Sequence, residues 1–425
     1  MAIDNQPTTS KDKADTNELL SRRVQQVIVK DNLQKKLDSG EKLAIKFGRD
    51  ARKPTLTLGH AVPILKLREF QEQGHQIVIV LGDFTSRLGD PDSDTTSREL
   101  MSKDEVTQNV QQIRKIFDKV LDPDKTEYVY NSEWLEPLNF VDVIELASNF
   151  TVQQNLERDL FQKRIAKGTP IGVQEFLYPI LQAYDSLAIS KRFGRCDLEL
   201  GGTDQTFNVL AGRALMKAQG LPPQDVLITP MILGTDGREM HSSQGNYISL
   251  TESPFDMYGR LMGVPDNLII NYLTLTTTMP MEKVTEVENK LKSGELSPID
   301  AKKILADEVV TFFHSAEDAA EAKQEFENVI QGHGLPADRI KYELGDQEKV
   351  NIVDLLTESG LASSKSDARR LVEGGGVDLV EVNSDGEVTS RTTIQDAIAD
   401  VSHGPHWTIV QVGKRKAVEL KRRKQ

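Results

Sequence analysis

Short apolar runs alternate with longer amphipathic stretches along the first part of the chain, as far as about residue 250. The run Ile77–Leu81 is apolar at every position, as expected for a strand that is covered on both faces. Because strands that alternate with helices form βαβ units, we predict an α/β fold with a doubly wound parallel sheet. The predicted strands are Leu43–Phe47, Ile77–Leu81, Glu127–Tyr130, Asp197–Leu200 and Val226–Met231, and the first predicted helices are Gly59–Gln73 and Lys103–Val120.

The pattern changes after Ser253, where amphipathic helices follow one another without a strand signal. We therefore predict an all-α domain at 251–331, a polar linker at 332–348, and a small α+β module at 349–425 in which Ser364 caps a helix. A polar leader with a first helix is assigned to 1–30. The helices predicted after Ser253 are Phe255–Met262, Asp266–Leu275, Glu282–Leu291, Asp300–Phe313, Ala316–Ile330, Ile352–Gly360 and Lys365–Glu373, and short β-rich runs end at Trp407–Val412.

Composition and charge narrow the class of protein. The longest apolar runs are of strand length, far short of the roughly 20 residues that cross a bilayer, which excludes a membrane protein. No targeting segment is evident, so we expect a cytoplasmic location. The single cysteine, Cys196, excludes an internal disulfide and a cysteine-based metal cluster. The net charge of −13 argues against indiscriminate nucleic-acid binding, yet the basic tail 413–424 predicts a polyanionic partner.

Candidate chemistry lies where the predicted strands end. Ligands bind outside the carboxyl ends of the strands in such sheets, so the loops after Phe47, Leu81, Leu200 and Met231 should converge on one site. The first loop holds Gly48-Arg49-Asp50 and leads to Gly59-His60 at a predicted helix start. A helix N-terminus offers amides to a phosphate, Gly59 admits a base against bare backbone, and His60 suits donation to phosphate. A structural histidine is the alternative.

Three further constellations carry polar groups in apolar surroundings. The loop Gly82–Gly89 precedes Asp90, which suits a cationic amino group, although an Asp-Pro turn is the simpler interpretation. Gly201–Gln205 follows a predicted strand and brings Asp204 and Gln205 to its end. A predicted helix places polar groups on one face at i, i+4 and i+7, where burial is costly unless they pair or bind a ligand. These polar groups are Tyr178, Gln182 and Asp185.

The order of these motifs resembles the bacterial-type tyrosyl-tRNA synthetase family of class I over nearly the whole chain. The resemblance is carried by Gly-x-Asp at 48–50, Gly-His at 59–60, Gly-Asp-Pro at 89–91, Tyr-x3-Gln-x2-Asp at 178–185 and Gly-Gly-Thr-Asp-Gln at 201–205. Residues 361–371 and 412–416 resemble the RNA-binding module that bacterial members carry at the C-terminus. The resemblance implies a Rossmann-like catalytic domain at 31–250, a helical anticodon-side domain at 251–331 and a homodimer.

The resemblance also implies substrates and roles for individual residues. The substrates would be L-tyrosine, ATP with Mg²⁺ and tRNA(Tyr), with no tightly bound protein metal site. Asp185 would accept a hydrogen bond from the phenolic hydroxyl of tyrosine. The other tyrosine-binding residues would be Lys46, Asp90, Tyr178, Gln182 and Gln205; the ATP-binding residues would be Gly48, Asp50, Gly59, His60, Gly202, Asp204, Ile232 and Met240; and the tRNA-binding residues would be Lys365, Arg369, Arg370, Lys414, Arg415 and Lys416.

The chain departs from the family pattern where the triphosphate should bind. The first motif usually reads His-x-Gly-His, but here it begins at Thr57, and Arg52 stands where a small hydroxyl residue is usual. The mobile loop motif usually reads Lys-Met-Ser-Lys-Ser, but here it reads Glu239-Met240-His241-Ser242-Ser243. The residues expected to act in catalysis are therefore His60, Thr57, Arg52, Glu239, Ser242 and Ser243.

These departures leave two hypotheses for the function. A unit charge about 4 Å from another is worth roughly 4 kcal/mol at an effective dielectric near 20, so a reversal from Lys to Glu beside a triphosphate is expected to cost several kcal/mol. The chain is therefore expected to be either a tyrosine–tRNA ligase with a rearranged triphosphate site or a catalytically silenced paralogue that binds tyrosine or RNA in a regulatory role.

Overall fold

The computed structural model describes most of the chain, which divides into two compact units. The first unit comprises Met1–Glu252 and Arg260–Phe313, and the second comprises Ser253–Gly259 and His314–Gln425. The predicted all-α segment 251–331 is thus divided between the units within α12 (Pro254–Met262). The described residues are 18–90, 100–240, 244–331, 335, 339–344, 349–383, 388–403, 407–413 and 416–422.

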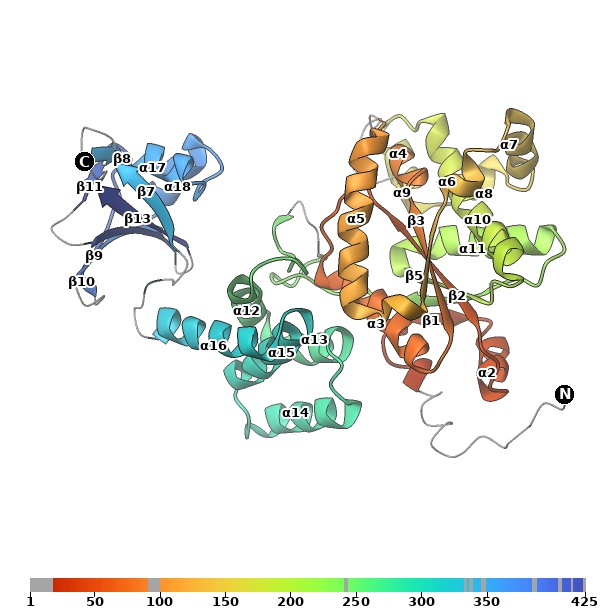
Figure 1. The fold of residues 1–425 in the computed structure, drawn as a ribbon, viewed down its shortest axis with the longest axis horizontal. Coiled ribbons are helices and arrows are strands. Elements are labelled where there is room, and N and C mark those ends of the chain that lie inside the picture. Colours follow the sequence, from red (N-terminus) through yellow and green to blue (C-terminus); the bar gives the residue numbers. More distant parts are fainter. Residues whose placement is uncertain are drawn as a thin grey trace. The chain divides into compact units, whose positions relative to one another are not determined.

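A six-stranded sheet with the order β1-β6-β5-β2-β3-β4 forms the centre of the first unit (Figure 1). The five strands β2 to β6 are parallel, which confirms the predicted doubly wound sheet. The edge strand β1, which the sequence assigned to the leader and first helix, pairs antiparallel with β6. The strands are β1 (Gln26–Ile28), β2 (Ala44–Asp50), β3 (Gln76–Gly82), β4 (Thr126–Tyr130), β5 (Leu198–Gly202) and β6 (Asp225–Thr229).

Helices cover both faces of this sheet. Val78 and Val80 of β3 pack in one apolar cluster with Ile180 of α10. On the other face, the ring of Phe47 in β2 lies 6.1 Å from that of Phe117 in α5. Coverage of both faces explains why β3 is apolar at successive positions. The helices of the unit are α2 (Lys30–Asp38), α3 (Leu58–Glu72), α4 (Thr85–Leu88), α5 (Lys103–Val120), α6 (Ser132–Leu135), α7 (Phe140–Ala147), α8 (Val152–Leu156), α9 (Asp159–Ala166), α10 (Val173–Phe193), α11 (Thr206–Ala218), α13 (Ile269–Thr276), α14 (Met281–Ser293) and α15 (Pro298–Phe313), with 3-10 turns η1 (Pro123–Lys125), η2 (Thr203–Gln205) and η4 (Asp266–Leu268).

Strand order places the ligand-binding edge of the sheet. β2 continues to β3 on one side, whereas its other neighbour is β5, so the direction of winding reverses between β2 and β5. The carboxyl ends of these two strands are therefore the expected site. β6 ends at Thr229, before the predicted end at Met231, because Pro230 has no N–H to donate to a neighbouring strand.

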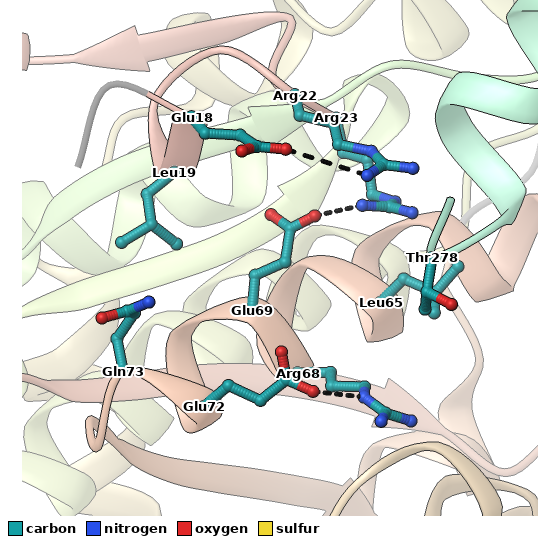
Figure 2. Close-up of a pocket in the computed structure, with 10 residues that line it drawn as sticks. All are labelled: Glu18, Leu19, Arg22, Arg23, Leu65, Arg68, Glu69, Glu72, Gln73 and Thr278. Carbon is teal, nitrogen blue, oxygen red and sulfur yellow. Dashed lines mark hydrogen bonds and ion pairs between the residues drawn. The ribbon is translucent and has the colours of Figure 1, made fainter. Parts of the chain in front are cut away.

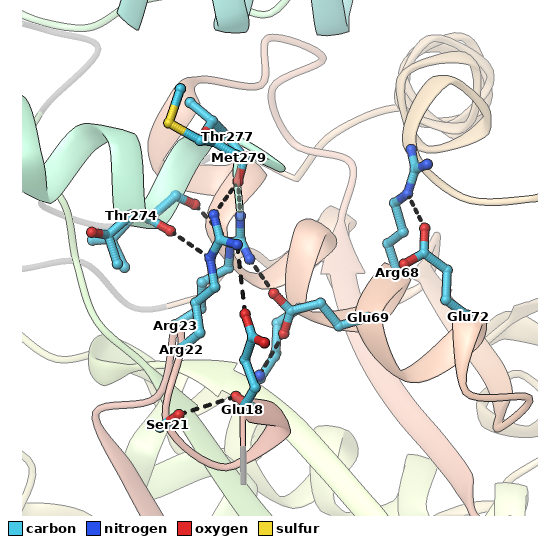
Figure 3. Close-up of polar contacts among 12 residues, drawn as sticks. Glu18, Ser21, Arg22, Arg23, Arg68, Glu69, Glu72, Thr274, Thr277 and Met279 are labelled. Atoms are coloured by element: carbon cyan, nitrogen blue, oxygen red, sulfur yellow. Dashed lines mark hydrogen bonds and ion pairs between the residues drawn. The ribbon is translucent and has the colours of Figure 1, made fainter. Parts of the chain in front are cut away.

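Two buried arginines fix the segment before β1 to the last turn of α13 (Figure 3). The Nε of Arg22 donates to the carbonyl of Thr274 at 3.0 Å, and the Nε of Arg23 donates to that of Leu275 at 2.9 Å. Both guanidinium groups also donate to the carbonyl of Thr277. Cations that bind the final carbonyls of a helix satisfy acceptors that the helix itself leaves open.

The same arginines connect to α3 through one carboxylate. Glu69 of α3 forms ion pairs with Arg23 and with Lys66, whose Nζ lies 2.6 Å from Glu69 Oε2. Lys66 is fully buried, and burial lowers its pKa to about 8. A cavity of about 200 Å³ opens beside this cluster (Figure 2). It lies at the C-terminal end of α3, roughly 15 Å along the helix from Gly59 and His60, so it is separate from the strand ends.

The second unit is a small α+β structure. Its five-stranded sheet has the order β10-β9-β12-β13-β7, and β11 pairs with β8. The side chain of Ser364 accepts a hydrogen bond from the N–H of Asp367, which confirms the predicted helix cap. Residues Ile340–Leu344, inside the predicted linker, form β7 instead, parallel to β13. The elements are α16 (Ala316–Gln331), β7 (Ile340–Leu344), β8 (Lys349–Asn351), α17 (Ile352–Glu358), α18 (Lys365–Glu373), β9 (Val377–Val382), β10 (Val388–Thr393), β11 (Asp400–Ser402), β12 (Trp407–Val412) and β13 (Lys416–Arg422).

The short apolar runs in the sequence predict that no segment crosses a membrane. Within the described part of the chain, none of the helices combines the length and the apolar character that a bilayer crossing requires.

Replacement of Glu69 by Gln is expected to lower the free energy of unfolding by about 3 kcal/mol, because it leaves the buried charges of Arg23 and Lys66 without their carboxylate. Chemical denaturation measures the change. Glu72→Gln on the same helix is the matched control, since Glu72 forms an exposed pair with Arg68 and should change stability by less than about 1 kcal/mol. Equal effects of the two substitutions would contradict this account of the cluster.

Candidate active site

The loops after the parallel strands converge, as predicted. Asp50 at the end of β2 accepts hydrogen bonds from Thr85 Oγ1 at 2.7 Å and from the Tyr178 hydroxyl at 3.1 Å. Gln205, after β5, donates from Nε2 to Asp90 Oδ2 at 2.9 Å. These bonds join residues that follow β2, β3 and β5 to one face of α10. The site therefore lies at the reversal point of the sheet.

Close backbone approach at this edge depends on Gly82. A Cβ at Gly82 would lie 2.2 Å from Asp50 Oδ1 and 2.5 Å from Thr85 Oγ1, so no other residue fits without moving that contact. By contrast, a Cβ at Gly48 would meet nothing within 4 Å. The protein itself thus leaves open the space beside Gly48, as a backbone that a ligand approaches should.

Gly59 brings the loop after β6 into the site. A Cβ there would lie 3.5 Å from Ile232 and 3.6 Å from the Met240 sulfur. Ile232 is buried and Met240 is partly buried. The structure therefore brings together Gly59, Ile232 and Met240, three of the residues for which the resemblance implied contact with ATP, around one piece of bare backbone.

His60 and Thr57 form the cap of α3. The Nδ1 of His60 accepts from the Thr57 N–H at 3.0 Å, and the Thr57 hydroxyl lies 3.0 Å from the same nitrogen. Burial, with the Arg49 cation nearby, lowers the pKa of His60 well below its ordinary value of 6.5. The ring is therefore neutral at pH 7, and because Nδ1 accepts, the proton must be on Nε2. His60 thus has a donor to offer to an anion.

Asp90 lies between an amide and a cation. Its Oδ1 lies 3.4 Å from Arg158 Nη2, while Gln205 donates to Oδ2. Burial raises the pKa of Asp90, although Arg158 opposes the shift. Sequence reasoning missed Arg158, whose guanidinium lies 5.4 Å from the ring centroid of Phe161 and is almost fully buried. In the sequence, Arg158 is recognisable only as an arginine that follows a capped, amphipathic turn. Such arginines are too common to mark a functional residue.

The polar face predicted for α10 exists. Tyr178 and Asp185 are buried, and the Trp134 indole donates to Asp185 Oδ1 at 2.8 Å. Burial raises the pKa of Asp185 to about 7, while Lys46 and Trp134 oppose the shift. The Oε1 of Gln182 is buried without a hydrogen-bond partner in the described residues. The helix therefore offers an unused acceptor and a buried carboxyl one turn apart, which is the arrangement a polar ligand would complete.

Lys46 lies behind this face of α10. It is fully buried, with its Nζ 2.9 Å from Glu199 Oε1, 2.9 Å from Ser186 Oγ and 3.4 Å from the carbonyl oxygen of Gln182. Burial lowers the pKa of the ammonium and is the largest single influence, but the interactions with Glu199, Asp185 and Cys196 together outweigh it, so the pKa is raised overall. The contact of Lys46 with the substrate, which the resemblance implies, stays a prediction; in the structure its ammonium forms an internal ion pair.

Other predicted residues hold the loops in place. Asp204 Oδ2 accepts from Gln205 Nε2 at 2.9 Å, and a Cβ at Gly202 would lie 2.6 Å from Asp204 Oδ1. Arg52 donates to the carbonyl of Ser86 at 3.2 Å. Glu239 is exposed, and its carbonyl accepts from Asn246 Nδ2 at 2.9 Å. Four predicted site residues lie outside the described residues: Ser242, Ser243, Lys414 and Arg415.

The four described residues among those predicted to bind tRNA are exposed on the second unit. Lys365 pairs with Asp354 at 2.7 Å, and Arg370 pairs with Asp367 at 2.8 Å. Arg369, in the same helix α18, and Lys416, at the start of β13, are also exposed. The N–H of Gly413 bonds to the carbonyl of Gly376 at 2.8 Å, which brings the turn before β13 next to the loop that follows α18.

Metal ligation was not predicted from the sequence. Across the ranges that the structure describes, no group of three or more His, Cys, Asp or Glu side chains is placed to hold a metal ion.

Comparison with known proteins identifies the family. A profile described as tRNA synthetases class I (W and Y) matches residues 38–331. A tyrosine–tRNA ligase of Thermotoga maritima is 47% identical over 360 residues, which cover 84% of this chain and 88% of the relative. The chain belongs to the tyrosine–tRNA ligase family. Another family member, from Moorella thermoacetica, is 41% identical over 407 residues, 95% of this chain and 94% of the relative. The resemblance drawn from the motifs is confirmed.

Solved structures show the same fold. A C-terminally truncated mitochondrial tyrosyl-tRNA synthetase of Aspergillus nidulans has a TM-score of 0.62 and 21% identity, over 74% of this chain and 94% of that one. A tyrosyl-tRNA synthetase of Archaeoglobus fulgidus, complexed with L-tyrosine, has a TM-score of 0.58 and 23% identity, over 73% of this chain and 99% of that one. The fold of the tyrosine–tRNA ligase family is therefore conserved far beyond recognisable sequence.

The raised pKa of Asp185 predicts a pH-dependent stability difference between the parent chain and Asp185→Asn. A buried carboxyl with a folded-state pKa of about 7 holds its proton more tightly than in the unfolded chain, so its ionisation destabilises the fold as pH rises from about 4 to about 7. The amide cannot ionise. In chemical denaturation, the free energy of unfolding of the variant should rise relative to that of the parent across this window, by at most about 1.4 kcal/mol per pH unit. The difference should be constant above about pH 8; a constant difference throughout would contradict the assignment.

Proposed function

We propose that this chain is a working tyrosine–tRNA ligase. In the first step, the carboxylate of L-tyrosine attacks the α-phosphorus of ATP, forming tyrosyl-adenylate and releasing pyrophosphate. In the second, the 3′ ribose hydroxyl of tRNA(Tyr) takes the tyrosyl group and AMP leaves. The observation that carries the proposal is the polar face of α10, where the buried Asp185 carboxyl lies one turn from the unpartnered Gln182 oxygen.

Asp185 would select tyrosine through its hydroxyl. A buried carboxylate that accepts this hydrogen bond is left without it by phenylalanine, and a stranded buried polar group costs about 1–3 kcal/mol. Gln182 Oε1 would accept from the substrate ammonium, together with Asp90, which accepts from Gln205, and Tyr178, which donates to Asp50. Lys46 would act from behind, since its Glu199 pair keeps a positive charge near the Asp185 carboxylate.

ATP would bind across the reversal point of the sheet. Gly48 and Gly59 would expose bare backbone to the nucleotide, and Ile232 and Met240 would border the base. His60 would donate from Nε2 to a phosphate oxygen, while Asp50 and Asp204 lie at the strand ends beside Gly202. The step needs no protein nucleophile, because positioning and stabilisation of phosphate charge suffice. Mg²⁺ would arrive with the triphosphate.

The second unit would hold the tRNA. Lys365, Arg369, Arg370 and Lys416 are exposed, and phosphate contacts of this kind supply affinity that falls with salt. The paired acids Asp354 and Asp367 would orient two of these cations rather than cancel them, because the pairs are solvent-exposed and weak. A cytoplasmic location, where tRNA is charged, fits this role.

Tyrosine-dependent ATP–pyrophosphate exchange tests the proposal. The parent chain should exchange, and phenylalanine should support at least about 10-fold less exchange, since it leaves Asp185 without its hydroxyl partner. Asp185→Asn should lose this preference. The silenced alternative makes the opposite prediction, tyrosine binding by calorimetry without any exchange. Equal binding of tyrosine and phenylalanine would remove the basis of the assignment altogether.

We further propose that the chain is a homodimer. Large apolar side chains are exposed along α7, α8, α9 and the start of α10, a concentration that water-facing surfaces of a monomer rarely show. Phe140 and Val173 are each 79% exposed. The other members of this group are Val141, Ile144, Val152 and Ile165.

The double substitution Phe140→Glu/Ile144→Glu should convert the dimer to a monomer, because it places charges on the surface that would otherwise be buried between copies. Light scattering or sedimentation measures the mass. Ile299→Glu is the control, since Ile299 is 60% exposed but lies on α15. A parent chain that is monomeric at micromolar concentration would refute the dimer without affecting the proposed chemistry.

A further inference from the structure

One cation at the candidate site, Arg49, has no hydrogen-bond partner among the described residues. Arg49 follows Gly48 in β2, and its Nε is buried without a hydrogen-bond partner, while no hydrogen bond or ion pair holds its guanidinium in the described residues. Guanidinium groups in protein interiors are otherwise paired almost without exception. Because Arg49 lies at the ligand-binding edge of the sheet, its guanidinium N–H groups are available to donate to a bound anion.

Strand register places Arg49 at the reversal point. Phe47 pairs with Leu200 in β5, so continuing the parallel register brings Arg49 level with Gly202. Alternation along the strand sets Phe47 and Arg49 on the face that packs against α5, whereas Lys46 points to the α10 face. Arg49 is therefore on the nucleotide side of the sheet and away from the Asp185 pocket.

The neighbours of Arg49 include two carboxylates, but neither forms a hydrogen bond with its guanidinium in the described residues. Burial lowers the pKa of Arg49, while Asp50 and Asp204 oppose the shift, so both carboxylates lie near it. Each is already engaged, Asp50 by Thr85 and Tyr178 and Asp204 by Gln205. The cation also depresses the pKa of His60, which places it near the start of α3.

We propose that Arg49 binds the triphosphate of ATP and replaces the lysine that the family's loop motif usually carries where this chain has Glu239. The inference rests on the proposed ligase function for the identity of the nucleotide. Planar guanidinium donors match phosphate oxygens two at a time, and the N-terminus of α3 with the His60 Nε2–H supplies further donors on the same side. Thr57 and Glu239 then need not contact phosphate.

The substitution Arg49→Gln tests the inference. In tyrosine-dependent ATP–pyrophosphate exchange, the KM for ATP should rise about 10- to 100-fold, the range expected for loss of a charge-assisted hydrogen bond, while the KM for tyrosine stays within about twofold. Arg49→Lys keeps the charge but loses the paired donors, so its KM for ATP should lie between those of Arg49→Gln and the parent. Arg114→Gln is the matched control, since Arg114 is 47% exposed on α5 and should leave both constants unchanged.

Calorimetric titration with inorganic pyrophosphate separates this inference from the proposed function. If the parent chain shows no exchange, the ligase function fails, but weaker pyrophosphate binding by Arg49→Gln would still support Arg49 as the phosphate ligand. If the parent exchanges and Arg49→Gln keeps the parent's KM for ATP and pyrophosphate affinity, the inference is overturned and the function stands. Should Arg49→Gln fail to fold, Arg49→Lys decides by the same two measurements.

Discussion

The Asp50 carboxylate joins three parts of the first unit that are distant in sequence. It ends β2, accepts from Thr85 after β3, and accepts from Tyr178 on α10. Burial raises its pKa to about 6, although both donors oppose the shift, so the carboxylate is stabilised only while both bonds are made. The contact with Thr85 also requires Gly82, because a Cβ there would occupy its space. The shape of the site depends on this one junction.

The charged residues near the site lie in three places: behind α10, on the face of α10 and on the opposite face of the sheet. Behind α10, Lys46 pairs with Glu199 in the dry interior, where an unpaired charge would cost several kcal/mol. On the face of α10, Asp185 is held by Trp134 and carries a raised pKa, which suits a carboxyl waiting for a hydroxyl donor. On the opposite face of the sheet, Arg49 has no hydrogen-bond partner within the part of the chain that the structure describes. One strand, β2, thus separates two binding chemistries by the alternation of its side chains.

The departures from the family pattern acquire a physical meaning in this arrangement. Thr57 keeps the cap of α3 intact and fixes which nitrogen of His60 carries the proton, so the helix start survives the loss of the usual histidine. Arg52 serves a structural purpose, since it bonds the Ser86 carbonyl and lies against Gly89, whose φ of 80° only glycine adopts freely. Triphosphate recognition would then shift from the loop motif to the strand end.

Much of this protein was determined by its sequence alone. Continuous apolar runs fix buried parallel strands, Ser364 fixes a helix cap, and the spacing of Tyr178, Gln182 and Asp185 fixes one polar helix face, because these are local properties of period and side-chain chemistry. The partners were decided only by the tertiary structure. Lys46 pairs with Glu199, Arg158 pairs with Asp90, and β1 and β7 join sheets, whereas Arg49 has no hydrogen-bond partner among the described residues. These outcomes depend on residues brought together from distant positions, which no local pattern records.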